Sequence, residues 1–142
     1  MAMPVVLRPL DPWCGTVVDC HDESGERLTR VFVDVTDVKR SQVKRADAVI
    51  VTHPYRDHYG GVPRTGPEVV YSDEVTAALL ELEGVDPGRL ERVKRCFEVG
   101  VFVVETYPIN HAVPEARAVL LEADARALIT GDWCALGEHP PL

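Results

Sequence analysis

Apolar runs separated by short polar segments fill the first third of the chain and predict β structure. Residues 5–10, 13–21 and 28–35 are rich in valine and leucine and predict three strands. The polar segment 22–26, which contains a glycine, lies between the second and third strands and is typical of a turn. We therefore expect this part of the chain to contain at least one hairpin.

A charged segment and another apolar run come next. Residues 37–44 are mostly charged, with Val38 and Val43 apolar, and they suit a short surface helix or a turn. Residues 46–52 are apolar and end in a polar cluster, as a strand buried within a sheet does. The candidate chemistry begins where this strand ends.

The middle of the chain predicts a helix, after a loop rich in glycine and proline (60–67) and a short strand (68–71). Ser72 suits the N-cap of this helix, and acidic residues in its first turn favour it electrostatically. An apolar stripe at i, i+4 and i+7 predicts its inward face, and a glycine suits its end. These residues are, in order, Asp73 and Glu74, then Val75, Leu79 and Leu82, and finally Gly84.

A second helix is predicted directly after the first. Asp86 suits its N-cap and Pro87 its first position. Leu90 and Val93 are then expected to face inward. The chain therefore places its helices together, between two groups of strands.

The β pattern resumes in the last third of the chain. Strands are predicted at 99–109, 118–122 and 127–130, with a turn at 123–126 between the last two. The order of strands, helices and strands favours a mixed α/β layered fold. A chain of 142 residues that is 46% hydrophobic can bury one sizeable core, so we expect a single domain, residues 1–142.

Charge and hydropathy limit the partners. The formal net charge of −8 repels phosphate backbones as a whole, so a nucleic-acid partner would need a local basic patch. No apolar run approaches the roughly 20 residues that span a bilayer, and the first residues do not resemble a secretion signal. We expect a soluble, cytoplasmic protein with no membrane partner.

Two basic clusters could supply such a patch, although a solvated helix face is the plainer interpretation of both. The first lies before the strand at 46–52, and the second lies on the predicted second helix. They comprise Lys39, Arg40, Lys44 and Arg45, and then Arg89, Arg92, Lys94 and Arg95. Trp13 and Trp133 are expected to pack in the core.

The four cysteines are too few and too widely spaced for a disulfide scaffold, and no pair has the spacing of a zinc ribbon. We interpret Cys14, Cys20, Cys96 and Cys134 as buried free thiols. Cys14 and Cys20 would share one face of a strand, because an even number of positions separates them. A bridge or thiolate site at that pair stays open as an alternative.

Metal-ligating side chains gather directly after the strand at 46–52. His53, Asp57 and His58 lie at a junction between strand and loop, where side chains can converge on one point. His111 and Asp132 each follow a later predicted strand. Neutral imidazoles and carboxylates suit zinc, manganese or iron. Each residue alone is typical of a solvated loop, but five at strand ends together predict one metal site.

Several segments resemble the metallo-β-lactamase superfamily. Residues 52–61, Thr-His-Pro-Tyr-Arg-Asp-His-Tyr-Gly-Gly, are similar to its T-H-x-H-x-D-H-x-G-G signature, and 129–133, Ile-Thr-Gly-Asp-Trp, to its T-G-D-[FW] segment. Residues 110–116, Asn-His-Ala-Val-Pro-Glu-Ala, match its third histidine motif, and Val33-Asp34 matches its L-I-D strand end. The resemblance is greatest to the nuclease branches, ribonuclease J and the cross-link repair nucleases of the Artemis type. It implies an αββα layered sandwich, here shortened at the C-terminus.

The resemblance also implies a hydrolase with two adjacent metal ions, usually zinc, that activate a bound water. The first ion would take His53 and His111, but Tyr55 stands where the family has a second histidine. A neutral phenol is a poor zinc ligand, because it must lose a proton to coordinate. The second ion would take Asp57 and His58, with Asp132 as the bridge.

Two further departures from the family concern the end of the chain. The family's last histidine lies on a strand well beyond the T-G-D segment, and here His139 is the only histidine left. The large added domain of the nuclease branches is missing as well. The resemblance therefore implies a site with one metal ion, or a compromised one, in which Asp57, His58 and Asp132 would be catalytic.

Three functions remain open. The first is a metal-dependent phosphodiesterase or nuclease-like enzyme, with Arg56 and Tyr55 as substrate-binding residues; Arg56 could equally be a surface charge or a partner for Asp57. The second is a non-catalytic subunit or regulatory protein of the same fold. The third is a hydrolase of a small ester, lactone or thioester. A shortened sandwich should leave apolar surface exposed, so we expect a homodimer or larger assembly.

Overall fold

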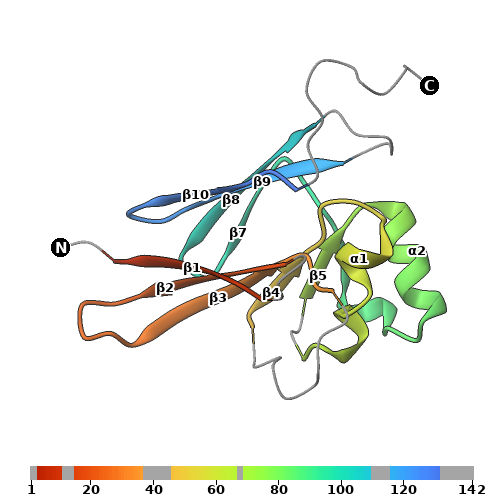
Figure 1. The fold of residues 1–142 in the computed structure, drawn as a ribbon, viewed down its shortest axis with the longest axis horizontal. Coiled ribbons are helices and arrows are strands. Elements are labelled where there is room, and N and C mark those ends of the chain that lie inside the picture. Colours follow the sequence, from red (N-terminus) through yellow and green to blue (C-terminus); the bar gives the residue numbers. More distant parts are fainter. Residues whose placement is uncertain (1–2, 11–14, 37–45, 67–68, 110–115, 132–142) are drawn as a thin grey trace.

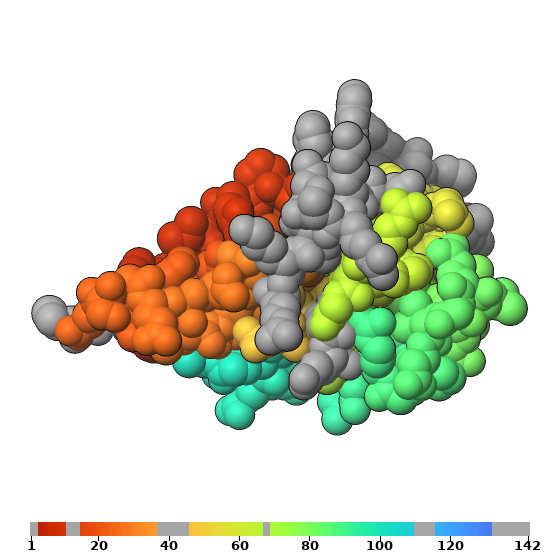
Figure 2. All heavy atoms as spheres, turned by 90° about the horizontal axis from the view of Figure 1, so that it is seen from below, coloured from red at the N-terminus to blue at the C-terminus, as the bar shows by residue number. Residues whose placement is uncertain are grey.

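Two β-sheets face each other in the computed structural model, and short helices cover one side of the larger sheet (Figure 1). The structure describes residues 3–10, 15–36, 46–66, 69–109 and 116–131. The hairpin of β2 and β3 (orange) and the helix α2 (green) lie at opposite ends of the molecule, as the view from below also shows (Figure 2).

The larger sheet has six strands that pair in the order of the sequence. The first three strands are antiparallel, and each later strand is parallel to the one before it. The parallel strands therefore end at the same edge of the sheet. The strands are β1 (Val5–Pro9), β2 (Thr16–His21), β3 (Arg27–Val33), β4 (Ala48–Ile50), β5 (Val69–Ser72) and β6 (Leu90–Arg92).

The smaller sheet has four antiparallel strands in the order β10-β9-β8-β7. Its strands are β7 (Cys96–Val99), β8 (Phe102–Pro108), β9 (Arg117–Glu122) and β10 (Arg126–Ile129). The turn between β7 and β8 contains Gly100, which has a φ of 54° and leaves no room for a side chain against Thr29. This turn therefore packs closely on the larger sheet.

Two apolar cores hold the layers together. Between the sheets, Val18, Val31 and Ile50 pack with Phe102 and Leu121, all of them fully buried. On the other side of the larger sheet, a second core joins it to the helical segments through Phe32, Val49, Tyr59, Val62 and Leu80. The helical segments are α1 (Arg56–Tyr59), η2 (Val62–Arg64), α2 (Glu74–Leu82) and η3 (Pro87–Arg89).

The helix α2 begins one residue later than expected and faces inward on a different side. Its N-cap is Asp73, whose carboxylate accepts hydrogen bonds from the backbone and the hydroxyl of Thr76. Thr76 and Leu80 are buried, whereas Leu82, expected to face inward, is 84% exposed. The predicted apolar stripe was therefore right for Leu79, which is partly buried against the second core, and wrong for Val75 and Leu82, which are exposed.

The predicted second helix was also wrong. Asp86 does cap the segment, accepting a hydrogen bond from the backbone of Gly88, but η3 makes only one turn. Leu90 to Arg92 then pair with β5 instead of continuing a helix. Of the second basic cluster, only Arg89 therefore lies in a helical turn, whereas Arg92 lies in β6 and forms an ion pair with Glu74. The first basic cluster lies outside the described residues.

The predicted strand 99–109 is divided in the structure. Its first residue ends β7, and a tight turn leads to β8, so the strand at Cys96–Val99 was missed. The hairpin at 22–26 is confirmed, with Asp22 accepting hydrogen bonds from the backbone of Ser24 and Glu26. In the described part of the chain, no helix is long and apolar enough to cross a membrane.

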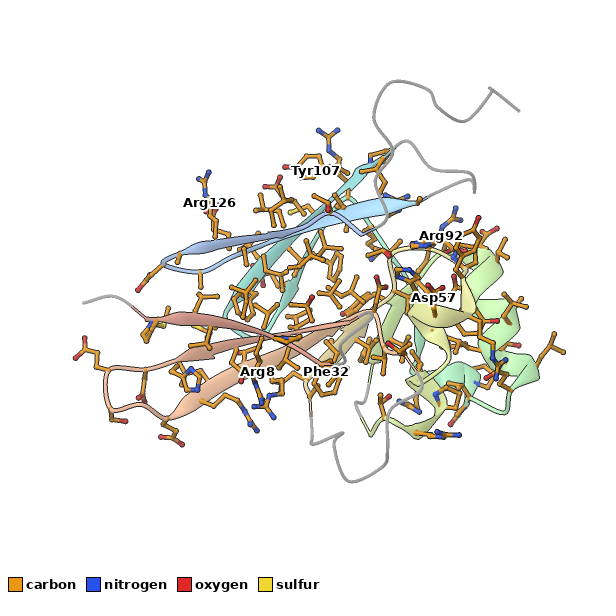
Figure 3. The ribbon with its side chains drawn as sticks, in the orientation of Figure 1. Arg8, Phe32, Asp57, Arg92, Tyr107 and Arg126 are labelled. Atoms are coloured by element: carbon orange, nitrogen blue, oxygen red, sulfur yellow. The ribbon has the colours of Figure 1, made fainter. Side chains whose placement is uncertain are left out.

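Side chains on the outer face of the smaller sheet are exposed. Tyr107 and Arg126 project away from the larger sheet (Figure 3), and Val103 is 41% exposed. Within the described ranges, no helix covers this face, so the second helical layer of an αββα sandwich is not seen there. The helices instead lie along the larger sheet (Figure 1).

The cysteines divide between core and surface. Cys20 is buried between the sheets, and this burial raises the pKa of its thiol. Cys96 is exposed, so the prediction of a buried thiol was wrong there, because Phe97 and Val99 of β7 face the core and Cys96 alternates onto the opposite side. Cys14 and Cys134, like Trp13 and Trp133, lie outside the described residues.

Candidate metal centre

The ends of β3 and β4 bring Asp34 and Thr52 together, because the two strands are parallel neighbours. The carboxylate of Asp34 accepts a hydrogen bond from the backbone of Thr52 through Oδ1 and one from its hydroxyl through Oδ2, both at 2.7 Å. Asp34 and Thr52 are 3% and 1% exposed. A buried carboxylate is costly unless hydrogen bonds satisfy it, and here Thr52 supplies two of them.

The backbone at Asp34 is left-handed, with a φ of 58°. The bend packs directly against Gly15. Only a residue without a side chain fits there, because a Cβ at Gly15 would lie 2.7 Å from the carbonyl oxygen of Asp34. The next residue, Val35, donates its backbone N–H to the carbonyl of His58 at 2.8 Å. The bend therefore joins the end of β3 to the short helix α1.

The imidazole of His58 is oriented by Asp34. Its Nδ1 lies 2.8 Å from Oδ2 of Asp34, and both side chains are buried. A carboxylate only accepts hydrogen bonds, so Nδ1 of His58 carries the proton. In the neutral ring, the lone pair that can bind a metal is then on Nε2.

His53 is oriented in the same way, through Thr52. Its Nδ1 lies 2.8 Å from the Thr52 hydroxyl, whose single proton is donated to Asp34. The hydroxyl therefore accepts from Nδ1 of His53, which leaves Nε2 as the nitrogen with the lone pair. The two imidazole rings lie with their centroids 3.9 Å apart.

Asp57 lies beside His58, at the start of α1 (Figure 3). Its Oδ2 is 3.5 Å from Nε2 of His58, and its side chain is 63% exposed. Two ligands with bonds of about 2.0 Å to one tetrahedral ion would be separated by about 3.3 Å. The observed separation therefore fits two ligands of one metal ion.

Asp34, His53 and His58 have ligand atoms that all lie within 4.8 Å of one another. Asp34 is close enough to the two histidines to be a metal ligand. Its oxygens, however, already accept three hydrogen bonds, two from Thr52 and one from His58. We assign it the role of orienting the histidines. In the sequence, only the family resemblance pointed to Asp34, although it follows a strand just as the predicted ligands do.

Tyr55 lies against His53, with ring centroids 5.0 Å apart in an edge-to-face arrangement. Its phenol therefore takes the place beside His53 that the motif gives to a second imidazole. Arg56 points away from this group, because Nη1 forms an ion pair at 2.7 Å with Glu83, the C-cap residue of α2. The predicted partner Asp57 is thus replaced by Glu83, and a role for Tyr55 or Arg56 in substrate binding stays a prediction.

His111 and Asp132 lie outside the described residues, and their roles as ligands stay predictions. Their described neighbours do approach Thr52. Arg117 donates its backbone N–H to the Thr52 carbonyl at 3.0 Å, and a Cβ at Gly131 would lie 3.1 Å from the Thr52 hydroxyl. The chain directly before position 132 therefore reaches the candidate centre.

A cavity of about 410 Å³ opens beside the centre. It lies between the ends of the two sheets and touches Asp34 and His58. The described residues that line it are Leu7, Gly15, Thr16, Val33, Asp34, His58, Leu128, Ile129, Thr130 and Gly131. A cavity of this size suits a small molecule.

Comparison with known proteins supports the fold. No protein-family model matches the chain. Its sequence is 32% identical over 131 residues to ribonuclease J of Sinorhizobium meliloti, covering 82% of this chain and 23% of that protein. The structure resembles the metallo-β-lactamase fold protein YhfI of Bacillus subtilis, with a TM-score of 0.56, 14% identity and coverage of 82% and 53%. A diphosphatase of the PhnP family has a TM-score of 0.55, 22% identity and coverage of 74% and 47%.

The two facing sheets, the helices along one of them and the histidines after β4 define a protein of the metallo-β-lactamase fold, as the sequence predicted. In sequence, the chain resembles the ribonuclease J branch of that superfamily, which confirms the resemblance drawn from its motifs. The chain spans 23% of the length of the ribonucleases J from Sinorhizobium meliloti and Mycolicibacterium smegmatis.

Proposed function

We propose that this chain is a metal-dependent hydrolase that cleaves phosphodiester bonds at a centre containing His53, Asp57 and His58. The observation that carries the proposal is the network of Asp34 and Thr52, which orients both imidazoles through Nδ1. A hydrogen bond at the ring nitrogen that does not bind the metal is typical of histidines that bind metals. The nearby oxygen of Asp57 supplies the carboxylate of the same donor set.

The donor set fits zinc, and manganese or iron would also suit it. His53, His58 and Asp57 would hold the ion, and His111 and Asp132 are the proposed remaining ligands. Such an ion, when bound, lowers the pKa of water and neutralises negative charge on the substrate. We propose that the centre binds one ion or two. The site of the first ion, at His53 and His111, would bind metal more weakly because Tyr55 replaces an imidazole there.

The residues of the chain contribute orientation and access. Asp34 and Thr52 hold the two rings in place, and neither needs to contact the substrate. His53 and His58 are buried, which keeps their rings rigid, whereas Asp57 is exposed on the solvent side. A substrate would therefore approach past Asp57 or through the cavity beside His58.

The phosphodiester class rests on similarity. The chain resembles a protein named ribonuclease J in sequence and a diphosphatase of the PhnP family in structure. Both names refer to cleavage at phosphorus. We transfer only this class of bond, because the chain spans 23% of that ribonuclease's length.

The experiment measures metal content and turnover together. Purified chain is dialysed against zinc or manganese, analysed for bound metal, and assayed with bis(p-nitrophenyl) phosphate. We expect close to one bound ion per chain and metal-dependent release of nitrophenol, both lost in the variant His53→Ala with His58→Ala. Metal far below one ion per chain together with no turnover would sink the proposal, as would faster cleavage of p-nitrophenyl butyrate than of the diester.

One observation favours a second candidate, a non-catalytic subunit of the same fold. Tyr55 packs on the edge of His53, where the motif has a histidine. A phenol contributes packing there without supplying a ready metal ligand. Turnover gained by Tyr55→His, from an inactive starting chain, would show an otherwise intact site, whereas bound metal without turnover in both proteins would support the non-catalytic role.

A further inference from the structure

We infer that Tyr55 is a metal ligand of this centre, and that its phenolate makes the site of the first ion selective for trivalent iron. The inference rests on the proposed function, since it names the metal of the same centre. The backbone of Tyr55, the position of its ring and the donor atoms around it carry the inference.

The backbone holds Tyr55 between the two histidines of the centre. Its N–H donates to the carbonyl of His53 at 3.0 Å, across Pro54, whose ring restricts the backbone angle φ. Its own carbonyl accepts the N–H of His58 at 2.8 Å, at the start of α1. The Cα of Tyr55 is therefore fixed relative to both proposed ligands.

The ring of Tyr55 contacts one of these ligands directly. It packs against the imidazole of His53, with centroids 5.0 Å apart and ring planes at 69°. Tyr55 is partly exposed, whereas His53 is fully buried, so the phenol lies between the centre and the solvent. Rotation about χ1 and χ2 can bring its oxygen to an ion beside His53 without moving the backbone.

The other three tyrosines have contacts that explain them without a metal. Tyr59 is buried in the core between the larger sheet and the helices, and Tyr71 packs against the core between the sheets. The hydroxyl of Tyr107 donates to the carboxylate of Glu105. Tyr55, by contrast, lies within the metal motif itself.

The donor atoms around Tyr55 favour an ion of high charge. Asp57 supplies a carboxylate oxygen 3.5 Å from Nε2 of His58, and a bound phenolate would add a second anionic oxygen. Anionic oxygens are hard ligands and suit hard cations, whereas softer cations select sulfur. Two such oxygens with two imidazoles therefore suit trivalent iron better than zinc.

The charge of the ion decides whether the phenol binds it. A phenol must give up its proton to coordinate, and an ion that attracts the anion more strongly favours this exchange. At the same distance, a trivalent ion attracts a phenolate about one and a half times as strongly as a divalent ion. We therefore expect zinc to leave the phenol unbound, whereas trivalent iron binds its oxygen and the proton passes to water.

Trivalent iron is compatible with the proposed reaction. Tyrosine is also an iron ligand in some haem proteins, so the pairing of phenolate and iron is established chemistry. Cleavage of a phosphodiester transfers no electrons, so the iron keeps its charge and no reductant is needed. Its positive charge would serve the same purpose as that of zinc.

The first experiment measures colour. Metal-free chain is loaded with ferric nitrilotriacetate at neutral pH, and the excess is removed. A phenolate bound to trivalent iron absorbs visible light by charge transfer, so we expect a coloured protein whose resonance Raman spectrum shows tyrosine ring vibrations. A chain that binds no ferric iron, or binds it without this band, would overturn the inference.

The second experiment removes a single hydroxyl group. Tyr55→Phe keeps the ring that packs on His53 and deletes the phenol oxygen. Tyr107→Phe is the matched control, because Tyr107 lies on the outer face of the smaller sheet and is 37% exposed (Figure 3). Only Tyr55→Phe should abolish the band. It should also weaken ferric binding at least about 10–100-fold, the loss that follows removal of an outer-shell partner alone.

A band that survives in Tyr55→Phe would assign the colour to another tyrosine and overturn the inference. The metal preference gives a further test, in which each protein is equilibrated with zinc and ferric iron together. The ratio of bound iron to bound zinc should fall at least about tenfold in Tyr55→His, because an imidazole replaces the anionic oxygen. An unchanged ratio would count against selection of iron by Tyr55.

Colour and turnover are measured on separate samples, so the two proposals can fail independently. A tyrosinate band without cleavage of bis(p-nitrophenyl) phosphate by any metal form would support Tyr55 as a ligand and contradict the proposed hydrolase. Cleavage with zinc by a chain that gives no band with ferric iron would support the hydrolase and overturn the assignment of Tyr55.

Discussion

Asp34 accepts a hydrogen bond from Nδ1 of His58 at 2.8 Å, although 24 positions separate the two residues in the chain. The same carboxylate oxygen accepts the hydroxyl of Thr52, which in turn accepts from His53. One buried carboxylate thus orients both histidines. Metal binding should therefore depend strongly on a residue that need not touch the metal.

The variant Asp34→Asn should weaken metal binding. Asparagine tolerates the left-handed backbone, but its amide places a donor where the carboxylate accepted. We expect zinc affinity to fall about 10–100-fold and the free energy of unfolding to fall by about 1–3 kcal/mol. Calorimetric zinc titration and urea unfolding measure the two effects.

The matched control is Asp57→Asn, because this carboxylate is 63% exposed. It should lower zinc affinity while leaving the free energy of unfolding within about 0.5 kcal/mol. Wild-type zinc affinity in Asp34→Asn would show that the network behind the histidines does not support metal binding.

Replacing Tyr55 by histidine should raise the amount of bound metal. The new imidazole would lie beside His53, where the phenol now packs edge to face. We expect a rise in bound metal per chain at limiting zinc, measured by elemental analysis after dialysis. Tyr55→Phe serves as the control and should leave the metal content unchanged. The prediction fails where Tyr55→His binds no more metal than Tyr55→Phe.

Gly61→Ala should be severely destabilising. Gly61 donates its backbone N–H to the carbonyl of Val35, and a Cβ there would collide with the carbonyl of Thr36. We expect the free energy of unfolding to fall by about 3 kcal/mol or more. Gly66→Ala is the control, since a Cβ at Gly66 meets nothing within 4 Å. Similar unfolding midpoints in urea for the two variants would refute this close approach.

The buried ion pair of Asp19 and Arg30 should make stability depend on pH. Burial alone raises the pKa of Asp19, but the hydrogen bond from Arg30 and its positive charge outweigh this and hold the pKa below the ordinary 3.8. A lowered carboxyl pKa stabilises the folded chain above pH 3.8, and this contribution is lost as the pH falls through the folded-state pKa. Urea unfolding at falling pH should show this loss.

Asp19→Asn removes one partner of the pair and tests the same contact. Breaking a buried ion pair in this way costs about 3–5 kcal/mol near neutral pH. The variant should also lose part of the pH dependence below about pH 4. A wild-type pH profile in Asp19→Asn would assign the acid sensitivity to other carboxylates.

We expect the outer face of the smaller sheet to mediate self-association. Val103 and Tyr107 are exposed there, Tyr107 projecting outward in Figure 3, and within the described ranges no helix covers this face. Val103→Lys should weaken a dimer measured by light scattering, because it would bury a charge in the contact. Val75→Lys, on exposed α2, is the control. A strictly monomeric wild-type chain would contradict this expectation.

The position of the centre could be predicted from sequence because it depends on strand ends. His53 and His58 follow β4, and the parallel pairing of β3 and β4 sets their edge of the sheet. Asp34 follows the same rule and could have been found by it. What local sequence did not reveal was that its carboxylate points back at Thr52 and His58, a contact that depends on the bend at Asp34.

The helical side was harder to predict, since tertiary contacts override local pattern there. Apolar spacing favoured Leu82 as a buried residue, yet Thr76 is buried instead because Asp73 caps the helix through it. Leu90 has a helical spacing to Val93, yet it pairs with Val70 in the sheet. Neither outcome is visible in a window of neighbouring residues.

The left-handed backbone at Asp34 also restricts how this centre can change over evolutionary time. Only glycine, asparagine and aspartate adopt that conformation readily, and of these only aspartate presents a carboxylate. A single substitution at this position therefore disturbs the chain direction, the charge of the network, or both. Substitutions at the exposed Asp57 or at Tyr55 can therefore accumulate with less disturbance of the fold than substitutions at Asp34.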